Sequence, residues 1–322
     1  MRFNTITFLS DYGLDDEFVG VVHSVIRSVA PEVRVIDLAH NISPHDVRAG
    51  GLALARSVQY MAPGVVLAVV DPGVGTHRRP VAIEVADGEA YLVGPDNGLL
   101  APAVAMVGGA TAAVVLDNTD YHLERFDPSV PSTFDGRDVF APVAARFCLG
   151  VPLTELGTVI DPALLLPGLL PVSEPDGDGG LKAEVLWIDR FGNAQLNVDP
   201  VDIADWPTTI SVTGGRLPRN AVRVATFGDI GTGGVGLLVD SYGLLALAVD
   251  RGSAAAELQL AEGDELTLRP VEGGTVAGQT SPVSLTAKRD GADSPSGGGG
   301  AHGSGGGRSG PSRTRPDDDF GQ

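Results

Sequence analysis

The stretch TITFLSDYGLDDEFVGVVHSVIRSVAPEVRVIDL, residues 5–38, decides the fold class of this chain. It opens with an apolar run that ends at Asp11, which is typical of a buried strand. Residues 17–30 then carry Val and Ile at helical spacing, and Pro31 ends that pattern. A second apolar run, residues 33–38, predicts another strand. Strand, helix and strand in this order indicate an α/β fold.

The segments that follow continue the same alternation. NISPHDV, residues 41–47, predicts a helix start with Ser43 as N-cap and Pro44 at the first helical position. VVLAVVD, residues 65–71, then predicts a third buried strand. This order favours a parallel sheet with right-handed crossovers.

Three aspartates follow from this arrangement as candidate ligand contacts. Asp11, Asp37 and Asp71 fall at the carboxyl ends of the three expected strands. Parallel sheets of this kind bind ligands at that edge.

Composition breaks divide the chain into parts. Residues 1–166 form the expected N-terminal α/β domain, and a Pro-, Gly- and Asp-rich segment over 167–180 predicts a linker. Short β runs with glycine turns over 181–276 predict a small C-terminal β-barrel domain. Residues 277–322 are rich in glycine with few large apolar side chains, so we expect a disordered tail.

The charge balance bears on the class of partner. Lys and Arg number 22 against 41 Asp and Glu, a formal net charge of −19, so phosphate-rich partners would be repelled. We therefore expect no nucleic-acid and no membrane partner. The single cysteine, Cys148, excludes an internal disulfide framework and lies in an apolar stretch typical of a buried thiol. With no signal-peptide pattern and no long apolar run, we expect a cytoplasmic protein.

Metal ligands are sparse in the sequence. His40 and His45 lie near the expected strand ends, but no HxxxH or HxH spacing accompanies them. We therefore expect no metal, and His23, on the polar face of its helix, receives no role.

Five short motifs carry polar side chains at junctions between elements. They are FLSDYGLDDEFVG (8–20), VDPGVGTHRRP (70–80), VGPDNGLL (93–100), STFDGRD (132–138) and IDRFGN (188–193). Taken singly, each is explained by helix capping, a tight turn or an ion pair. In IDRFGN, the acceptor Asp189, the aromatic ring of Phe191 and the amide of Asn193 fit the edge of a purine. A β-turn would also use the Gly-Asn pair at 192–193.

Taken in order, the five motifs resemble one family, the S-adenosylmethionine (SAM) hydroxide adenosyltransferases, or SAM hydrolases, which are related to fluorinase and chlorinase. The resemblance covers roughly residues 4–275. It implies an α/β domain followed by a β-barrel, and a homotrimer that binds SAM between the N-domain of one subunit and the C-domain of its neighbour. It also implies hydrolysis of SAM to adenosine and L-methionine without a cofactor.

The resemblance implies substrate contacts in both domains. Asp11 matches the acceptor for the ribose hydroxyls. The other matching positions are Asp16, Asp189 and Ser241 for the methionine ammonium and carboxylate, Phe191 and Asn193 for the adenine, and Asn97, Phe134 and Tyr242 for further substrate contacts. Tyr242 stands where the fluorinases have Arg.

The resemblance also implies a catalytic trio. Asp71 and Arg78 match two residues that position the attacking water, and Asp135 stands where the family has His. Water would attack the ribose C5′ in line with the departing sulfur, Asp71 would accept its proton, and Arg78 would orient Asp71. Asp135 either acts as a second acceptor or leaves Asp71 to act alone.

Other functions stay open at the level of sequence. A chlorinase-type halogenase would need a halide beside Asp71, whose charge disfavours it by roughly several kcal/mol in a partly dry pocket. The chain also lacks the fluorinase insertion before residue 94. A non-catalytic SAM- or adenosine-binding protein and a metal phosphoesterase built on the Asp and His residues are the remaining alternatives.

Overall fold

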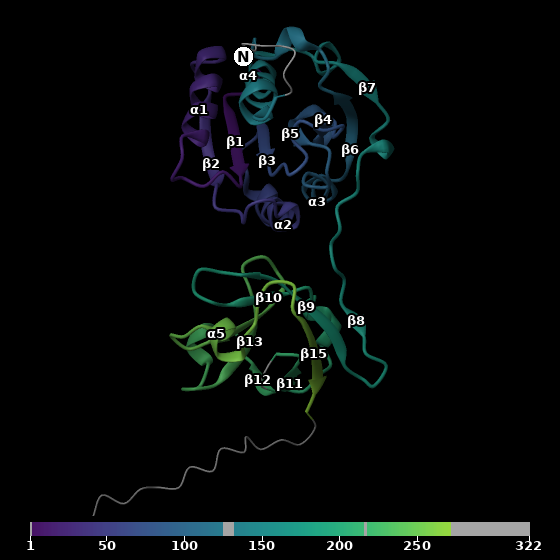
Figure 1. Cartoon of the computed structure of the whole chain (residues 1–322). Helices are drawn as coiled ribbons and strands as arrows, with labels where there is room; N and C mark the ends of the chain where they lie inside the picture. The colour runs from purple at the N-terminus through teal and green to yellow at the C-terminus, as the bar shows by residue number, and fades with distance from the viewer. Residues whose placement is uncertain (1, 125–131, 216–217, 272–322) are drawn as a thin grey trace, which may run out of the picture. The chain divides into compact units, whose positions relative to one another are not determined.

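The structure is a computed structural model that describes residues 2–124, 132–215 and 218–271 (Figure 1). The tail expected to be disordered, residues 277–322, lies outside this range. Within the described residues, no helix combines the length and the apolar character that crossing a bilayer requires.

The first half of the chain builds a seven-stranded mixed sheet in the order β2-β1-β3-β5-β4-β6-β7. Its strands are β1 Thr5–Ser10, β2 Arg34–Ala39, β3 Val65–Val69, β4 Pro80–Val85, β5 Ala90–Pro95, β6 Ala110–Val115 and β7 Thr158–Ile160. The expected parallel pairing holds for β2, β1, β3 and β5. Strands β4, β6 and β7 are antiparallel to their neighbours. The connection from β4 to β5 is too short for a crossover helix, so these strands form a hairpin.

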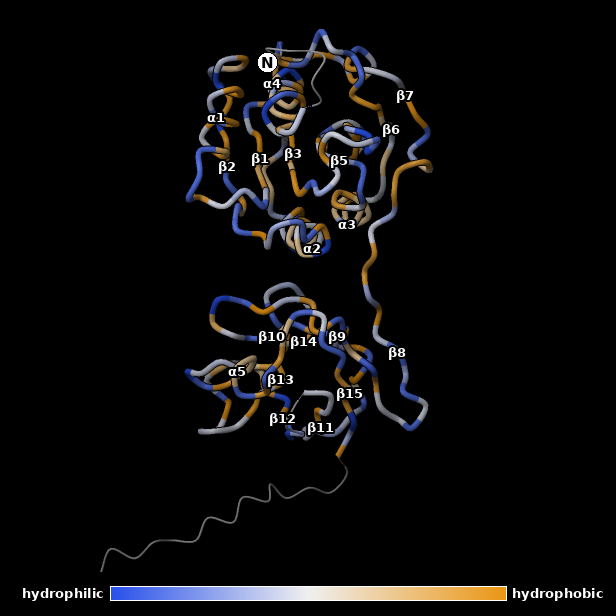
Figure 2. The backbone as a smooth tube through the Cα atoms, viewed as in Figure 1, coloured by the Kyte–Doolittle hydropathy of each residue, from blue (hydrophilic) through white to orange (hydrophobic). Residues whose placement is uncertain are grey.

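Helices cover both faces of this sheet. Their bounds are α1 Phe18–Val29, α2 Val47–Ser57, α3 Ala101–Met106 and α4 Ala141–Leu149. Helices α1 and α4 pack together over one face, and α2 and α3 over the other (Figure 1). The central strands β1 and β3 are largely orange in Figure 2 because both of their faces are buried. The α/β architecture expected from the sequence is confirmed.

The start of α2 differs from the sequence prediction. Its N-cap is Asp46, whose Oδ1 accepts a hydrogen bond of 2.8 Å from the Ala49 amide, and not Ser43. His45 has a φ of 69°, so the chain cannot be helical between Ser43 and Asp46. Asp is as good an N-cap as Ser and lies next to the first helical residue.

The topology leaves a gap at the carboxyl ends of β1 and β3. The chain leaves β1 through α1 to β2 on one side, and returns through α2 to β3 on the other side. The two helices cover opposite faces of the sheet, so neither closes the edge between β1 and β3. Such a switch point is where open α/β sheets bind ligands.

The second half of the chain forms a closed barrel. Its strands are β9 Leu181–Ile188, β10 Ala194–Leu196, β11 Thr209–Thr213, β12 Arg219–Arg223, β13 Val235–Val239, β14 Leu245–Val249 and β15 Glu265–Pro270. They run in the order β10-β14-β13-β12-β11-β15-β9, and pairing of β10 with β9 closes the ring. Strand β8, Glu174–Pro175, adds to β9, and helix α5, Ala254–Leu258, packs against the barrel core. The predicted C-terminal barrel is confirmed.

Candidate active site

A pocket of about 270 Å³ lies at the switch point of the N-terminal sheet. Asp11 directly follows β1, and Asp71 follows the adjacent strand β3. Phe134 and Asp135 reach the same pocket from the segment that precedes α4. The parallel register of β1 and β3 therefore brings two predicted aspartates to one opening, as the strand pattern indicates.

Arg78 links two of the pocket carboxylates. Its Nε donates to Asp71 Oδ1 at 3.0 Å, and its Nη2 donates to Asp71 Oδ2, so the pair is bidentate. The same Nη2 donates to Asp135 Oδ2 at 2.7 Å. The three side chains are between 6% and 14% exposed. The predicted catalytic residues thus form one carboxylate–guanidinium–carboxylate cluster at the pocket.

The surroundings of Asp71 alter its acidity. Burial raises the pKa of the Asp71 carboxyl, the Arg78 guanidinium opposes that rise, and the like charge of Asp135 adds to it. The net shift of the pKa is upward. A carboxylate with a raised pKa is a better proton acceptor than an ordinary one, and the positive charge of Arg78 favours its ionised form.

An aromatic wall closes one side of the pocket. The rings of Tyr12 and Phe18 each meet the Phe134 ring edge to face, with centroids 5.4 Å and 5.1 Å apart, and they are tilted against each other at 5.7 Å. Burial and the charges of Asp11, Asp71 and Asp135 raise the pKa of the Tyr12 hydroxyl, so it stays protonated. The wall offers apolar area and one neutral hydroxyl beside the carboxylates.

Gly136 is required by the close approach of Tyr12. A Cβ at this position would lie 2.1 Å from the Tyr12 hydroxyl oxygen. Gly136 also begins a π-helical turn, Gly136–Phe140, that leads into α4. Such turns are frequent at functional sites, and here the turn follows directly after Asp135.

We predict that Gly136→Ala displaces Tyr12 and raises the KM for substrate at least tenfold. Gly136→Ala/Tyr12→Phe lacks the hydroxyl oxygen, so it keeps only contacts of 3.1 Å to the added Cβ, from the two neighbouring rings, and its KM should return toward that of the unaltered protein. Gly20→Ala, in α1 with nothing within 4 Å of the added Cβ, is the matched control. Steady-state kinetics of the variants, with melting temperatures alongside, measure the effect; an unchanged KM in Gly136→Ala would contradict it.

The remaining N-domain candidates differ in their surroundings. Asp11 lines the pocket, and its Oδ2 accepts a hydrogen bond of 2.9 Å from the His45 amide. Asp16 is exposed and does not line the pocket. Asn97 uses its amide within the fold, donating to the Val70 carbonyl at 2.9 Å and accepting from the Leu99 amide at 3.1 Å.

The C-terminal candidates gather at a second pocket, of about 360 Å³, on the barrel. Asp189, Phe191, Asn193, Ser241 and Tyr242 all line it. Phe191 is 78% exposed, so its ring is accessible for stacking. Asp189 holds the turn by accepting from the Phe191 amide at 2.8 Å and from the Asn193 amide at 2.9 Å.

Sequence reasoning missed some side chains of these pockets. Tyr12 and His45 line the N-domain pocket, yet only their positions beside Asp11 and Pro44 could have suggested it. In the barrel pocket, Asp240 accepts from the Tyr242 amide at 2.8 Å and also binds the Gln195 amide group. Gln195 is 2% exposed and carries no signal in the sequence, because its burial depends on barrel closure.

The fold and the pockets together define a class of protein: an α/β-plus-barrel enzyme with a buried carboxylate–guanidinium cluster at the switch point of its sheet. The comparisons with known proteins agree. Residues 6–157 match the model of the SAM hydroxide adenosyltransferase N-terminal domain, and residues 183–267 match that of the C-terminal domain.

Individual relatives support the same assignment. The chain is 47% identical to the (R)-S-adenosyl-L-methionine hydrolase of Salinispora tropica over 81% of this chain and 96% of that protein. It is 41% identical to the protein of that name in Thermus thermophilus, over 80% and 96%. A crystal structure of an uncharacterised conserved protein from Thermotoga maritima superposes with a TM-score of 0.73 at 32% identity, covering 82% and 99% of the two chains. This chain belongs to the SAM hydroxide adenosyltransferase family.

Proposed function

We propose that this protein hydrolyses S-adenosyl-L-methionine to adenosine and L-methionine. The observation that carries the proposal is the buried Asp71–Arg78–Asp135 cluster at the pocket between β1 and β3. The hydrolase relatives of the chain support the choice of substrate and reaction.

The charge of the N-domain pocket suits a sulfonium substrate. Three carboxylates, of Asp11, Asp71 and Asp135, meet one guanidinium, that of Arg78. With all four ionised, this set carries a net charge of −2. Low-dielectric walls strengthen its attraction for the cationic sulfur and its repulsion of a halide. Water is therefore the nucleophile that this pocket favours.

In the proposed reaction, a water molecule held by Asp71 attacks the ribose C5′ of SAM. The new C–O bond forms as the C–S bond breaks, and the bonding electron pair of C–S stays on sulfur as neutral thioether. The proton lost by the water passes to Asp71. Because the leaving group needs no proton, the residues of this chain have two tasks: to place the water in line and to accept its proton.

Arg78 and Asp135 act on Asp71 in this scheme. The bidentate contact of Arg78 fixes the plane of the Asp71 carboxylate, which sets the direction from which the water is held. Asp135 takes the same Nη2 from the other side. It raises the proton affinity of Asp71 through its charge, and in this way takes the place of the family His.

The barrel pocket supplies the second set of substrate contacts in this proposal. Phe191 and Asn193 would hold the adenine, and Asp189 and Ser241 the amino-acid end of methionine, with Tyr242 beside them. We propose that a homotrimer joins an N-domain pocket of one subunit to the barrel pocket of its neighbour. A cytoplasmic setting suits the thiol of Cys148, which is buried and has its pKa raised to about 12.

Turnover of SAM in ¹⁸O-labelled water tests the function. The full chain should release adenosine that carries the label in its 5′-hydroxyl, and unlabelled methionine. Label in any other position would contradict attack at C5′, and SAM or adenosine binding without turnover would establish a non-catalytic binding protein. Parallel reactions in chloride, bromide or iodide should give no 5′-halogenated adenosine; its appearance would identify a halogenase.

The pH dependence of kcat should show the influence of Asp135. Asp71 accepts a proton only when ionised, so activity falls as the pH drops through its raised pKa. We predict that Asp135→Asn, by removing a like charge that raises this pKa, moves the acid limb of the profile to lower pH. Asp87→Asn removes an equal charge at an exposed turn and should leave the limb in place. A limb unmoved in Asp135→Asn would show that Asp135 does not act on Asp71.

A further inference from the structure

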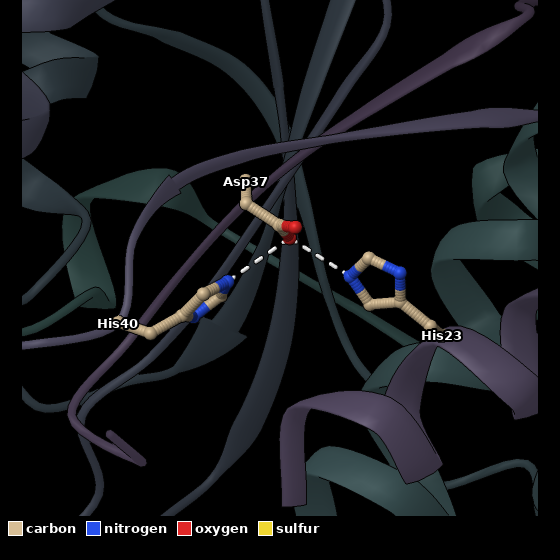
Figure 3. Close-up of side chains that lie close together, drawn as sticks. All are labelled: His23, Asp37 and His40. Carbon is tan, nitrogen blue, oxygen red and sulfur yellow. Dashed lines mark hydrogen bonds and ion pairs between the residues drawn. The ribbon is translucent and has the colours of Figure 1, made fainter. Parts of the chain in front are cut away.

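A second cluster of polar side chains lies outside the proposed catalytic groups. The Nε2 atoms of His23 and His40 lie 2.8 Å and 3.0 Å from the same atom, Asp37 Oδ1. Figure 3 shows both imidazole rings pointing a nitrogen at this carboxylate. One ligand atom from each of the three residues falls within 4.8 Å of the others.

Three different parts of the N-domain meet at this cluster. His23 comes from the middle of α1, and Asp37 from within β2, whose residue 37 pairs with Phe8 of β1. His40 directly follows β2, and its ring packs edge-on against Phe8 at a centroid distance of 4.6 Å. Asp37 thus lies inside β2, not at its carboxyl end as the sequence pattern indicates, and its side chain contacts α1.

We propose that His23, Asp37 and His40 bind one divalent cation of the zinc class. Two imidazole nitrogens and one carboxylate oxygen are ligands that Zn²⁺ takes at about 2.0–2.2 Å, usually with four ligands in a tetrahedron. Ligand atoms of such a site stand a little over 3 Å apart, so the observed N–O separations need to open by only a few tenths of an ångström. Water would complete the coordination.

Ser10 supports this proposal from behind His40. The Ser10 hydroxyl lies 2.8 Å from His40 Nδ1. Histidine ligands of metals commonly pass their second ring N–H to an acceptor, which fixes the ring and the tautomer. A serine hydroxyl can donate or accept, so Ser10 fits His40 both without a cation and with Nε2 bound to one.

The three side chains of the cluster differ in burial, and the more exposed ones lie where an ion would enter. The His40 side chain is 3% exposed and is fixed between Ser10 and Phe8, while those of His23 and Asp37 are 35% and 46% exposed. One ligand is therefore rigid, and two are free to adjust and to release water as the ion arrives. The exposed side of the cluster gives the entry path.

The bound cation would connect α1 to the end of β2, next to residues 11–13, which follow β1 and begin with Asp11 of the N-domain pocket. The His40 carbonyl accepts a hydrogen bond of 2.6 Å from the Gly13 amide, and Ser10 directly precedes Asp11. An ion held there stabilises this arrangement without touching the substrate. Since the three ligands come together only in the folded chain, the ion binds that state more tightly and raises the melting temperature with its concentration.

Zinc uptake by the full chain tests the proposal. The metal-free protein is incubated with excess ZnCl₂ and freed of unbound metal by gel filtration, and its zinc content is measured. We expect one zinc per chain, and a rise in melting temperature with added ZnCl₂. Co²⁺ in place of Zn²⁺ should give the visible absorption of a tetrahedral N/O site.

Three variants locate the ion. His23→Gln and Asp37→Asn alter exposed ligands, so they should fold, and each should lower zinc affinity at least tenfold and abolish the melting shift. His77→Gln removes an exposed histidine elsewhere and should bind zinc as the unaltered chain does. An unaltered chain that takes up no zinc, or ligand variants that keep full uptake, would overturn the proposal. Zinc content is read without SAM, so failure of the proposed hydrolysis leaves this result unaffected.

Discussion

Replacing Asp71 by Asn lowers kcat for SAM hydrolysis by about 10²–10⁴-fold, the usual contribution of a positioned general base. The amide keeps the size of the side chain and still accepts a hydrogen bond from Arg78, but it cannot take the proton of the attacking water. Binding of adenosine should change little, because the contacts proposed for the base and the ribose lie on other residues. Single-turnover kinetics and calorimetric titration with adenosine separate the two effects.

Two controls sharpen the Asp71→Asn experiment. The melting temperature shows whether the loss of a buried charge beside Arg78 disturbs the fold, and Asp71→Glu keeps a base but moves it by one methylene. An intermediate rate in Asp71→Glu and a low rate in Asp71→Asn are expected. Undiminished turnover in Asp71→Asn would remove Asp71 from the chemistry.

The sequence predicts that Asp11 and Asp71 lie at the same edge of the sheet, because local sequence patterns are enough to place both residues at strand ends. Both residues follow short apolar runs, and parallel strands joined by crossover helices end at one edge of the sheet. Residues 5–71 contain all of this information. The adjacency of β1 and β3 then follows from the alternating sides of the two crossovers.

Other contacts depend on packing that a local pattern does not contain. Arg78 and Asp135 are 57 positions apart, and their 2.7 Å contact requires the turn before α4 to lie against the loop after β3. The meeting of His23 with Asp37 depends in the same way on the rotation of α1 about its axis. The apolar spacing of α1 predicts the buried face, with Val22 and Ile26, but not which strand residue an adjacent polar side chain reaches.

The family resemblance predicts some of the contacts between distant side chains that local patterns miss, but not all of them. It brings Asp71, Arg78 and Asp135 together as a trio, although one member differs in type from the family residue. The resemblance does not predict the His23–Asp37–His40 cluster, which is recognised from the distances between its side chains.

Replacing Arg78 by Met should have the largest effect on stability. The side chains of Asp71 and Asp135 are 6% and 14% exposed, and Arg78 contacts both. Removing one partner of a buried ion pair costs about 3–5 kcal/mol of unfolding free energy, because the remaining charges are left without compensation. Urea denaturation at pH 7 measures this loss. Arg34→Met, at an exposed position of β2, should change the unfolding free energy by no more than about 0.5 kcal/mol.

The pH dependence of the unfolding free energy lost in Arg78→Met identifies the cause of the loss. Without the guanidinium, which lowers the pKa of Asp71, burial and the neighbouring carboxylate raise it further above its value in the unfolded chain. The folded variant then binds more protons than the unfolded one, so its stability rises as the pH falls through this range. The difference from the unaltered protein should therefore shrink at acid pH.

The triple variant Arg78→Met/Asp71→Asn/Asp135→Asn should recover stability at pH 7 while remaining inactive, since neutral amides need no cation. Two outcomes would contradict this explanation: a loss of unfolding free energy in Arg78→Met that is equal at all pH values, or one that the two amides do not reduce. Either would mean that Arg78 stabilises the site by packing and not by its charge. The packing partner would be Phe140, whose ring centroid lies 5.4 Å from the guanidinium carbon.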